Sequence, residues 1–382
     1  MVKYTMTSRE RLLTVLRGKL PDCVPVAPDT SNMIPAKLTG LPFWDLYLYR
    51  KIPIWEAYIE CARFFNFDAL MDGYFPLTFP YEEKEQGNWN TYIVLMREDR
   101  IVTQRAYRKW GRLRWESTVT VYYRQDPPTY NFKPEKIGLP ETPQKWLPLE
   151  GVEDVDTGPT GLKRVKELMG DQGLVGVNVT GCNAFSNEED IFRYYDHPEL
   201  HEQWALKRYE KAERRFTAIM EMDEKPDFLC VGGSGTFITG TEEMFRRIAF
   251  PAVKRVTELA SAAGIPTHLH SCGPERRLVE IMAEETTLTV IDPLEVPPMG
   301  DCDLGDLKRR FGHKIVLKGN LHTTDIMLRG TPDSVSEASL RAIDAAAAGG
   351  RFILSTGDQC GRDTPFENIR AMIDTARTYG KY

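Results

Sequence analysis

The feature that most limits the fold of this chain is a regular alternation of short apolar runs with amphipathic helical stretches from residue 158 onwards. Strands separated by helices at this spacing are typical of parallel βαβ units. Two earlier apolar segments, "CVPVAP" (23–28) and "FDALMD" (67–72), raise the number of predicted strands to eight. The six later strands are expected at "GLVGVNV" (173–179), "DFLCVGG" (227–233), "IPTHLHS" (265–271), "TLTVID" (287–292), "KIVLKGN" (314–320) and "RFILSTG" (351–357).

Eight such units predict an α/β fold of the (β/α)8 TIM-barrel type. Helices are expected between the later strands, at 192–222, 241–263, 275–285, 335–348 and 365–379. A doubly wound open sheet is the alternative, but no G-x-G-x-x-G motif follows the first predicted strand to favour it.

The first 150 residues depart from this alternation. Thr7 and Glu10 have capping-box spacing ahead of a short helix. Residues 91–125 are rich in β-branched and aromatic side chains without helical spacing, which predicts an inserted antiparallel hairpin or small sheet. The proline-rich stretch 127–148 is expected to cross the surface. We therefore expect one domain, residues 1–382, carrying this insert.

Composition limits the classes of partner. The net charge is -6, no basic cluster is longer than "KRR", and no segment approaches 18 consecutive apolar residues. These properties argue against nucleic-acid and membrane binding and favour small molecules or proteins as partners, with a homodimer left open. Seven cysteines without paired spacing, and no signal-peptide pattern at the start, predict reduced thiols and a cytoplasmic location.

Catalytic groups of barrel enzymes come from the C-terminal ends of strands, so the residues that close each apolar run are the candidates. Neutral and acidic side chains there suit hydrogen bonds to a polar substrate, although each of them could equally cap the following helix. The substrate-binding candidates are Asp29, Asn32, Asp72, Asn178 and Asn320.

The stretch "PTHLHSCG" places His268, His270 and Cys272 at alternate positions, so all three face the same side of one strand. Imidazole nitrogen and thiolate sulfur are both zinc ligands, and a further strand must complete such a site. "STGDQC" supplies Asp358 and Cys360 as candidate metal ligands at the last strand. Asp292 could add a carboxylate.

Two other interpretations of this stretch stay open. In the first, His270 and Cys272 are an ordinary polar strand end. In the second, Cys272 is a nucleophile with a histidine base, but the sequence indicates no third group to orient that base.

Three long segments resemble the uroporphyrinogen decarboxylase superfamily: "EEMFRRIAFPAVKRVTELASAAGIPTHLHSCG" (242–273), "KIVLKGNL" (314–321) and "GRFILSTGDQCGRDTPFENIRAMIDTARTYG" (350–380). The resemblance begins at "TSRERLLTVLRGKLPDCVPV" and covers nearly the whole chain. It implies a (β/α)8 barrel. The decarboxylases carry an arginine-rich segment after the first strand, whereas this chain has "VAPDTSNMIPAKLTG", so the resemblance favours the zinc- and corrinoid-dependent methyltransferase branch, which includes methylcobamide:coenzyme M methyltransferases.

The resemblance implies zinc bound by His270 and Cys272, together with a ligand from the last strand. The family's cysteine directly after "STG" is replaced by Asp358, and Cys360 follows two residues later, so either could complete the site, or no metal binds. The chain has no cobalamin motif of its own, so a corrinoid protein is the expected partner. The expected reaction takes a methyl group from a methoxylated small molecule, with an aromatic methyl ether as one candidate, to that corrinoid, as in O-demethylation. Transfer from methyl-corrinoid to a thiol, and decarboxylation, are the alternatives.

Overall fold

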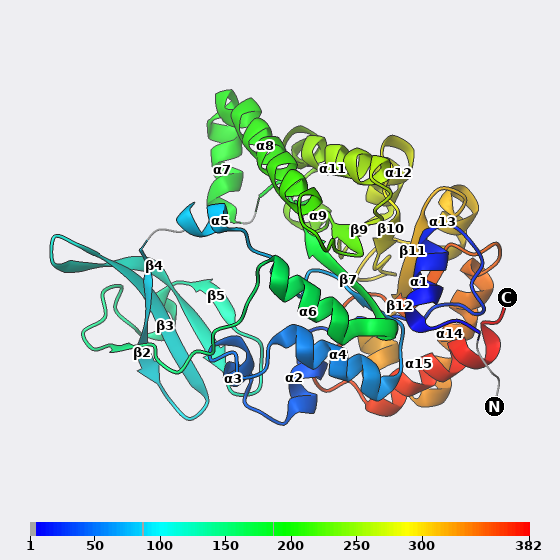
Figure 1. Cartoon of the computed structure of the whole chain (residues 1–382), viewed down its shortest axis with the longest axis horizontal. Coiled ribbons are helices and arrows are strands. Elements are labelled where there is room, and N and C mark those ends of the chain that lie inside the picture. Colours follow the sequence, from blue (N-terminus) through cyan, green and yellow to red (C-terminus); the bar gives the residue numbers. More distant parts are fainter. Residues whose placement is uncertain (1–4, 86–87, 186) are drawn as a thin grey trace.

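Seven parallel strands form a curled sheet at the centre of the molecule (Figure 1). The structure is a computed structural model that describes residues 5–85, 88–185 and 187–382. The sheet order is the chain order. Its strands are β1 (Ala69–Met71), β7 (Gly173–Asn178), β8 (Phe228–Cys230), β9 (Thr267–His270), β10 (Val290–Asp292), β11 (Val316–Leu321) and β12 (Phe352–Thr356). Six of these strands lie within a predicted apolar run, and β11 extends one residue past its run, which confirms the alternation of strands and helices.

Helices connect these strands and cover the outside of the curled sheet (Figure 1). Neighbouring helices pack in sequence, α12 on α13, α13 on α14 and α14 on α15, and α15 returns to pack on α4. The helices on the outside are α4 (Ile54–Phe65), α6 (Pro159–Met169), α8 (His201–Met220), α11 (Phe250–Ala262), α12 (Arg276–Glu285), α13 (Leu304–Phe311), α14 (Pro332–Ala346) and α15 (Phe366–Tyr379), whereas α1 (Ser8–Leu16) packs against the inner face.

Shorter helical segments occupy the loops. They are α2 (Met33–Thr39), α3 (Phe43–Tyr47), α5 (Pro80–Glu85), α7 (Glu188–Asp196), α9 (Thr236–Thr239) and α10 (Glu242–Met244), the single turns Pro134–Ile137, Gly170–Gln172 and Pro198–Leu200, and the π-helical stretches Phe245–Ala249 and Thr323–Leu328. None of the helices in the described ranges combines the length and the apolarity that crossing a bilayer would need.

The predicted first strand, residues 23–28, differs from the expectation. It forms one isolated parallel bridge, from Val26 to Leu354 of β12, and on its other side Asp68 N donates to Val26 O at 2.8 Å. Prolines at 21, 25 and 28 lack the N–H groups that a regular ladder would need. The parallel sheet therefore has seven strands, and the prediction of a closed eight-stranded barrel is corrected to a barrel-like, incompletely closed sheet.

One face of the parallel sheet carries both the inner core and the polar strand ends. The lower part of this face packs against α1, in a buried cluster of Leu12, Val15, Leu16, Ala27, Leu70, Leu174, Phe228, Cys230, Val290, Val316 and Ile353. Side chains alternate along a strand, so the residue two places beyond a core residue lies on the same face. Asp72 follows Leu70 in this way, and Asp292 follows Val290. A period of two therefore gathers the strand-end side chains above the core.

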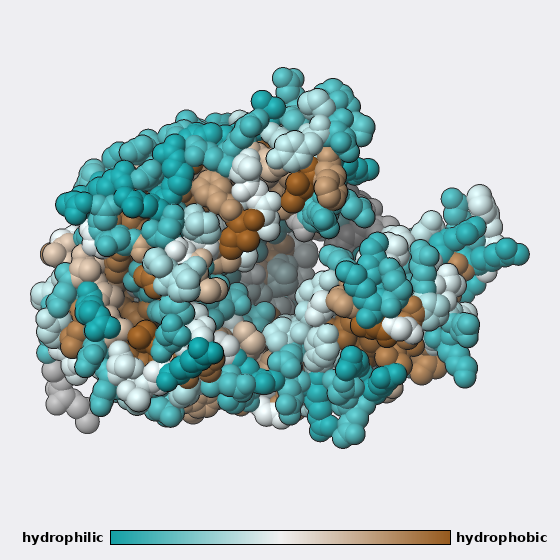
Figure 2. Space-filling view, turned by 180° about the vertical axis from the view of Figure 1, so that it is seen from behind, coloured by the Kyte–Doolittle hydropathy of each residue, from teal (hydrophilic) through white to brown (hydrophobic). Residues whose placement is uncertain are grey.

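A separate antiparallel sheet lies between β1 and β7 in the chain and to one side of the parallel sheet in space (Figure 1). Its order is β5-β4-β3-β2-β6. Its strands are β2 (Asn90–Met96), β3 (Arg100–Lys109), β4 (Arg112–Tyr123), β5 (Thr129–Phe132) and β6 (Leu147–Pro148). The predicted insert at 91–125 is confirmed, and it is larger than expected because two strands of the proline-rich stretch join it. Figure 2 shows this lobe at the right, with a hollow between it and the main body.

Candidate functional site

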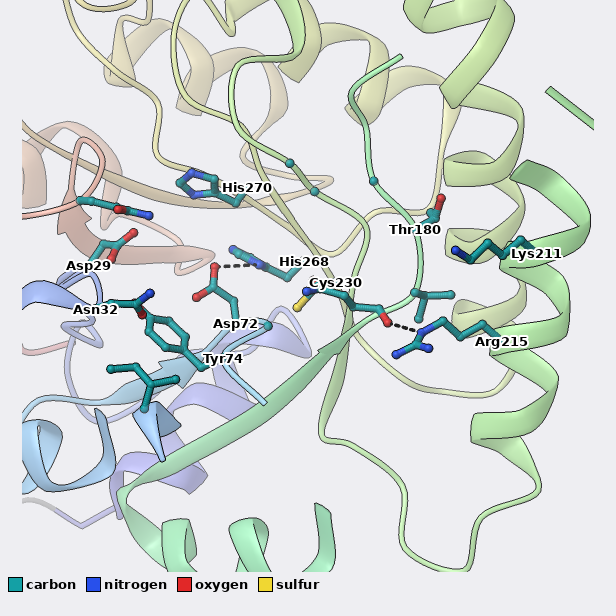
Figure 3. A pocket seen from close by; sticks show the side chains of 18 of the residues that line it. Asp29, Asn32, Asp72, Tyr74, Thr180, Lys211, Arg215, Cys230, His268 and His270 are labelled. Atoms are coloured by element: carbon teal, nitrogen blue, oxygen red, sulfur yellow. Dashed lines mark hydrogen bonds and ion pairs between the residues drawn. The ribbon is translucent and has the colours of Figure 1, made fainter. Parts of the chain in front are cut away.

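A cavity of about 610 Å³ opens at the C-terminal ends of the parallel strands (Figure 3). Four of the five predicted substrate-binding residues line it: Asp29, Asn32, Asp72 and Asn178. The lining also includes Ile54, Gly73, Tyr74, Glu82, Val179, Thr180, Gly181, Lys211, Arg215, Cys230, Gly232, Gly233, His268, His270 and Gln359. The strand ends therefore converge on one cavity, as a barrel-type fold requires.

Asn320, the fifth predicted substrate-binding residue, lies elsewhere. Its side chain is buried, and its Nδ2 atom donates to Leu294 O at 3.0 Å. This hydrogen bond ties β11 to the loop after β10, so the structure gives Asn320 a structural role and not the predicted contact with the cavity.

Three of the four predicted metal ligands come together. One ligand atom each from His270, Cys272 and Asp358 lies within 4.8 Å of the others. The Nε2 atom of His270 is buried without a hydrogen-bond partner among the described residues, and it lies 3.6 Å from Asp358 Oδ1. Asp358 has a φ of 116°, a backbone conformation that is costly for a residue with a side chain.

This geometry fits a bound metal ion. A buried imidazole nitrogen without a partner is costly in a protein interior, and a cation would satisfy it. Nitrogen, sulfur and carboxylate oxygen are all ligands of zinc, and three protein ligands with an open position are typical of catalytic zinc sites.

Cys360, the fourth predicted ligand, lies outside this group. It is fully buried, its N–H donates to Asp29 O at 2.9 Å, and its carbonyl accepts from Ser31 Oγ at 2.9 Å. Burial, and to a lesser extent the nearby Asp29 carboxylate, raise the pKa of the Cys360 thiol to about 12. A protonated buried thiol is a packing residue and a poor metal ligand.

Asp292 lies directly behind the metal-ligand group. Its Oδ1 atom is 3.1 Å from His270 Nδ1 and 3.1 Å from His268 Nε2, and its Oδ2 atom pairs with Lys318. Burial disfavours the charge on Asp292, but Lys318 and the two histidines outweigh it and hold its pKa well below the usual range. Since a carboxylate can only accept, His270 donates from Nδ1 and presents Nε2 to the metal-ligand group.

The pKa values of two further carboxyl groups of the site, Asp72 and Asp358, shift in the opposite direction to that of Asp292. Burial raises the pKa of Asp72, against the opposing influence of His268 and Lys318. Burial also raises the pKa of Asp358, which His270 partly offsets. His268 itself is buried between Asp72, 3.6 Å away, and Asp292, so it supports the site from below and is not among the three clustered ligands.

The sequence did not identify several residues of the site. Lys318 lies inside an apolar strand, and a lysine in such a run is a usable signal because it must find a buried partner. Lys211 and Arg215 reach the cavity from α8, one turn apart (Figure 3). Because α8 carries many other charged residues, the spacing of these two does not identify them as cavity residues. Arg215 donates to Asn178 O at 2.7 Å and pairs with Glu82.

The aromatic side chains of the antiparallel insert do not line the cavity. Tyr74, which follows β1 and precedes the insert, is the aromatic residue in its lining. Trp115 packs edge-on against Tyr92 and Trp146 within the antiparallel sheet, at ring-centroid distances of 5.3 Å each. These rings form a satellite cluster and give no argument for an aromatic substrate.

Comparison with known sequences gives partial matches. Residues 234–379 match the family described as uroporphyrinogen decarboxylase (URO-D). The chain is 26% identical over 141 residues to the methylcobamide:CoM methyltransferase MtbA of Methanosarcina mazei, and 27% identical over 77 residues to the uroporphyrinogen decarboxylase of Coxiella burnetii. The first match covers 36% of this chain and 37% of MtbA, so it spans little more than a third of that relative.

Comparison with solved structures extends over the whole chain. A structure described as a methyltransferase from Methanosarcina mazei aligns with a TM-score of 0.58, over 98% of this chain and 99% of that one. At 16% sequence identity, this likeness establishes the fold alone.

Proposed function

Because residues 234–379 match the uroporphyrinogen decarboxylase family and the chain is similar to methylcobamide:CoM methyltransferases, we propose that this protein is a corrinoid-dependent methyltransferase. In the proposed reaction, a methyl group passes from a methoxylated small molecule in the cavity to the cobalt(I) of a corrinoid on a partner protein. The observation that carries the proposal is the group of His270, Cys272 and Asp358 beside the cavity.

Zinc is the proposed metal, held by His270 Nε2, Cys272 Sγ and a carboxylate oxygen of Asp358. When bound, it would supply Lewis-acid stabilisation of the oxygen that loses the methyl group. An oxygen ligand in place of a second thiolate leaves more positive charge on the metal, which suits an ether oxygen better than a thiol. The ligand set therefore supports demethylation of an ether over methylation of a thiol.

The side chains around the cavity would bind and orient the donor. Asp72 and Asn178 offer hydrogen-bond acceptors and a donor, and Tyr74, with the apolar side chain of Ile54, offers an apolar surface. Asp292 would keep His270 in the tautomer that leaves Nε2 free. Holding the methyl carbon in line with an incoming cobalt is the contribution that such positioning makes to the rate.

Atoms and electrons balance in this transfer with water as the proton source. The methyl–oxygen bond breaks, a methyl–cobalt bond forms, and cobalt(I) supplies the electron pair and becomes cobalt(III). The demethylated oxygen leaves as an alcohol or phenol after taking a proton from water.

The test is methyl transfer to a reduced corrinoid, with zinc measured on the same preparation. Conversion of cob(I)alamin to methylcobalamin by the purified protein and a methoxylated donor, with one zinc per chain, is the expected result. Demethylation of methylcobalamin by thiols without any ether would instead support the reverse reaction. Metal-independent release of carbon dioxide would support decarboxylation. Absence of both zinc and transfer from every methoxylated donor would overturn the proposal.

A further inference from the structure

The hairpin of β3 and β4 carries a concentrated positive charge on a chain whose net charge is -6. No acidic residue occurs between residues 100 and 115. Five exposed cations lie in this part of the hairpin: Arg105, Arg108, Lys109, Arg112 and Arg114. Of these, Arg105 alone has a carboxylate within reach among the described residues, that of Glu116 at 3.9 Å. The rest of the chain, without these five charges, has a net charge of -11 (-6 minus 5).

Two features of the hairpin tip oppose stable folding. Trp110 is 84% exposed and has a φ of 49° at the first position of the two-residue turn, where asparagine, aspartate or glycine is favoured. Lys109 and Arg112 are directly opposite each other in the register, and like charges in that position repel. The tip therefore keeps a large strained aromatic residue and a repelling pair that a turn chosen only for stability would lack.

The part of the hairpin next to the tip is braced by aromatic packing, so the tip is presented on a firm support. Trp89 packs edge-on against Tyr107 with ring centroids 4.6 Å apart, and the guanidinium of Arg105 lies over Trp89 at 5.4 Å. At the tip, Lys109 lies over the Trp110 ring at 4.7 Å. Tryptophan and arginine are the residues that most often dominate the affinity of protein interfaces.

The position of the insert relates it to the cavity. The chain leaves the parallel sheet for the insert at the C-terminal end of β1, immediately beyond Asp72, so the insert rises from the end of the sheet where the cavity opens. Figure 1 shows the β3–β4 hairpin projecting from the rest of the molecule, and Figure 2 shows the hollow between its lobe and the main body. A macromolecule placed over the cavity would therefore have this hairpin at its side.

We propose that the tip of this hairpin, Lys109 to Arg112, docks an acidic surface of the corrinoid-carrying protein. The inference rests on the proposed function, because a corrinoid held by a protein must approach the cavity with that protein above it. Charge complementarity indicates the acidic surface, and the exposed Trp110 ring supplies an apolar anchor that becomes buried there. The tip contributes to the encounter and the affinity and takes no part in the methyl transfer.

The test compares a corrinoid protein with free cob(I)alamin as acceptors, using the full-length chain loaded with zinc. The double variant Lys109→Glu/Arg112→Glu reverses the charge and keeps a like-charged pair, but it removes the contact of Lys109 with the Trp110 ring, so its melting temperature is measured together with its kinetics. We expect the KM for the corrinoid protein to rise about tenfold or more, with kcat and the rate with free cob(I)alamin unchanged. Arg17→Glu/Lys19→Glu, at the other end of the sheet beside α1, changes the charge equally and should leave every rate unchanged.

Trp110→Asn provides an independent arm. Asparagine favours the turn, so the melting temperature should stay equal or rise, while the KM for the corrinoid protein increases. A merely structural role for Trp110 predicts the opposite change in stability and no change in KM.

The outcomes separate the two proposals. Normal transfer by the wild type with an unchanged KM in both hairpin variants overturns the docking role alone. The docking role is also overturned if the only effect of these variants is loss of self-association or loss of nucleic-acid binding. A wild type that methylates neither free cob(I)alamin nor the corrinoid protein overturns the proposed function and this docking partner with it.

Discussion

The imidazole of His270 is held through its Nδ1 atom by the carboxylate of Asp292, 3.1 Å away, while its Nε2 atom is buried without a hydrogen-bond partner among the described residues. The second oxygen of Asp292 pairs with the buried Lys318. The Asp292 carboxylate thus connects two groups. Lys318 keeps this carboxylate ionised, and the carboxylate in turn fixes the tautomer of His270, a candidate metal ligand.

Replacing Asp292 by asparagine should damage both the metal site and the fold. An asparagine amide can donate as well as accept, so it no longer fixes the proton of His270 on Nδ1. Residues that support metal ligands in this way typically contribute 10- to 100-fold to metal affinity. Lys318 would lose its ionised partner, and breaking a buried pair costs about 3–5 kcal/mol of the free energy of unfolding. Zinc competition with a chelator and denaturant unfolding measure the two effects.

The matched control for this variant is Asp374→Asn, on the exposed surface of α15. It should retain zinc affinity and stability within about 0.5 kcal/mol of the wild type. Equal zinc affinity in Asp292→Asn and the control would show that Asp292 does not orient His270.

A second prediction concerns the ligand from the last strand. Asp358→Ala should lower zinc affinity at least tenfold, because it removes one of three ligand atoms, whereas Cys360→Ala should leave zinc content unchanged. X-ray absorption at the zinc edge should find one sulfur ligand, from Cys272. Two sulfur ligands, or zinc loss in the Cys360 variant alone, would assign the site to Cys360.

A third prediction tests the close approach of two strands beneath the site. A Cβ at Gly232 would lie 2.3 Å from the backbone N of His270, which is the backbone of the neighbouring strand end. Gly232→Ala must displace that strand end, with a cost of about 1–3 kcal/mol in the free energy of unfolding and a measurable loss of zinc affinity.

Gly305→Ala, in α13, serves as the control for the glycine variant. A Cβ there meets only Asp303 Oδ1 at 3.5 Å, so helix propensity should make this change neutral or stabilising by up to about 1 kcal/mol. If Gly232→Ala unfolded at the same denaturant concentration as the wild type, the close contact between Gly232 and the His270 backbone would make no contribution to the free energy of unfolding.

A fourth prediction concerns stability in acid. Burial disfavours the charge of Asp227, but hydrogen bonds from Arg9, at 2.5 Å, and from Val175 N, at 2.9 Å, together with the charge of Lys166, lower its pKa below the ordinary value. The unfolded chain therefore binds this proton at a higher pH than the folded chain does. The contribution of Asp227 is fully present above the ordinary aspartate pKa of about 3.9 and is lost as the pH falls towards the folded-state value.

Asp227→Asn should accordingly be less stable than the wild type at neutral pH, with a difference that shrinks as the pH falls below about 4. Urea unfolding between neutral pH and pH 3 measures this convergence. Stability curves that stay parallel over that range would mean that the ion pair with Arg9 adds no pH-dependent stability.

The order of the elements could be predicted because each depends on neighbours in the sequence. The Thr7 side chain caps α1 in a capping box with Glu10, as the spacing indicated, and seven of the eight predicted apolar runs hold a parallel strand. Closure of the sheet could not be predicted in the same way. It depends on whether residues 23–28 form a regular ladder with β1 and β12, and the prolines there, which lack N–H groups, limit the parallel pairing to one bridge, from Val26 to Leu354.

In the candidate site, too, the residues on a strand could be predicted from the sequence, and those in a loop could not. The two-residue alternation in "THLHSC" was enough to place His270 and Cys272 together, since a strand fixes which face each side chain occupies. The choice between Asp358 and Cys360 lies in a loop without such a period. There the positive φ of Asp358 directs its side chain to His270, and the Asp29 carbonyl holds the backbone of Cys360 away from the group.

By itself, the sequence determined which side chains stand at the ends of the parallel strands, because hydrophobic period and strand order are local properties. Only the tertiary structure decided which of them share a cavity and which become support. Asn320 donates a hydrogen bond to Leu294 O, and Lys318 forms an ion pair with Asp292 of the neighbouring strand. Buried polar groups must find partners wherever the packed chain brings them, and those partners are distant in sequence.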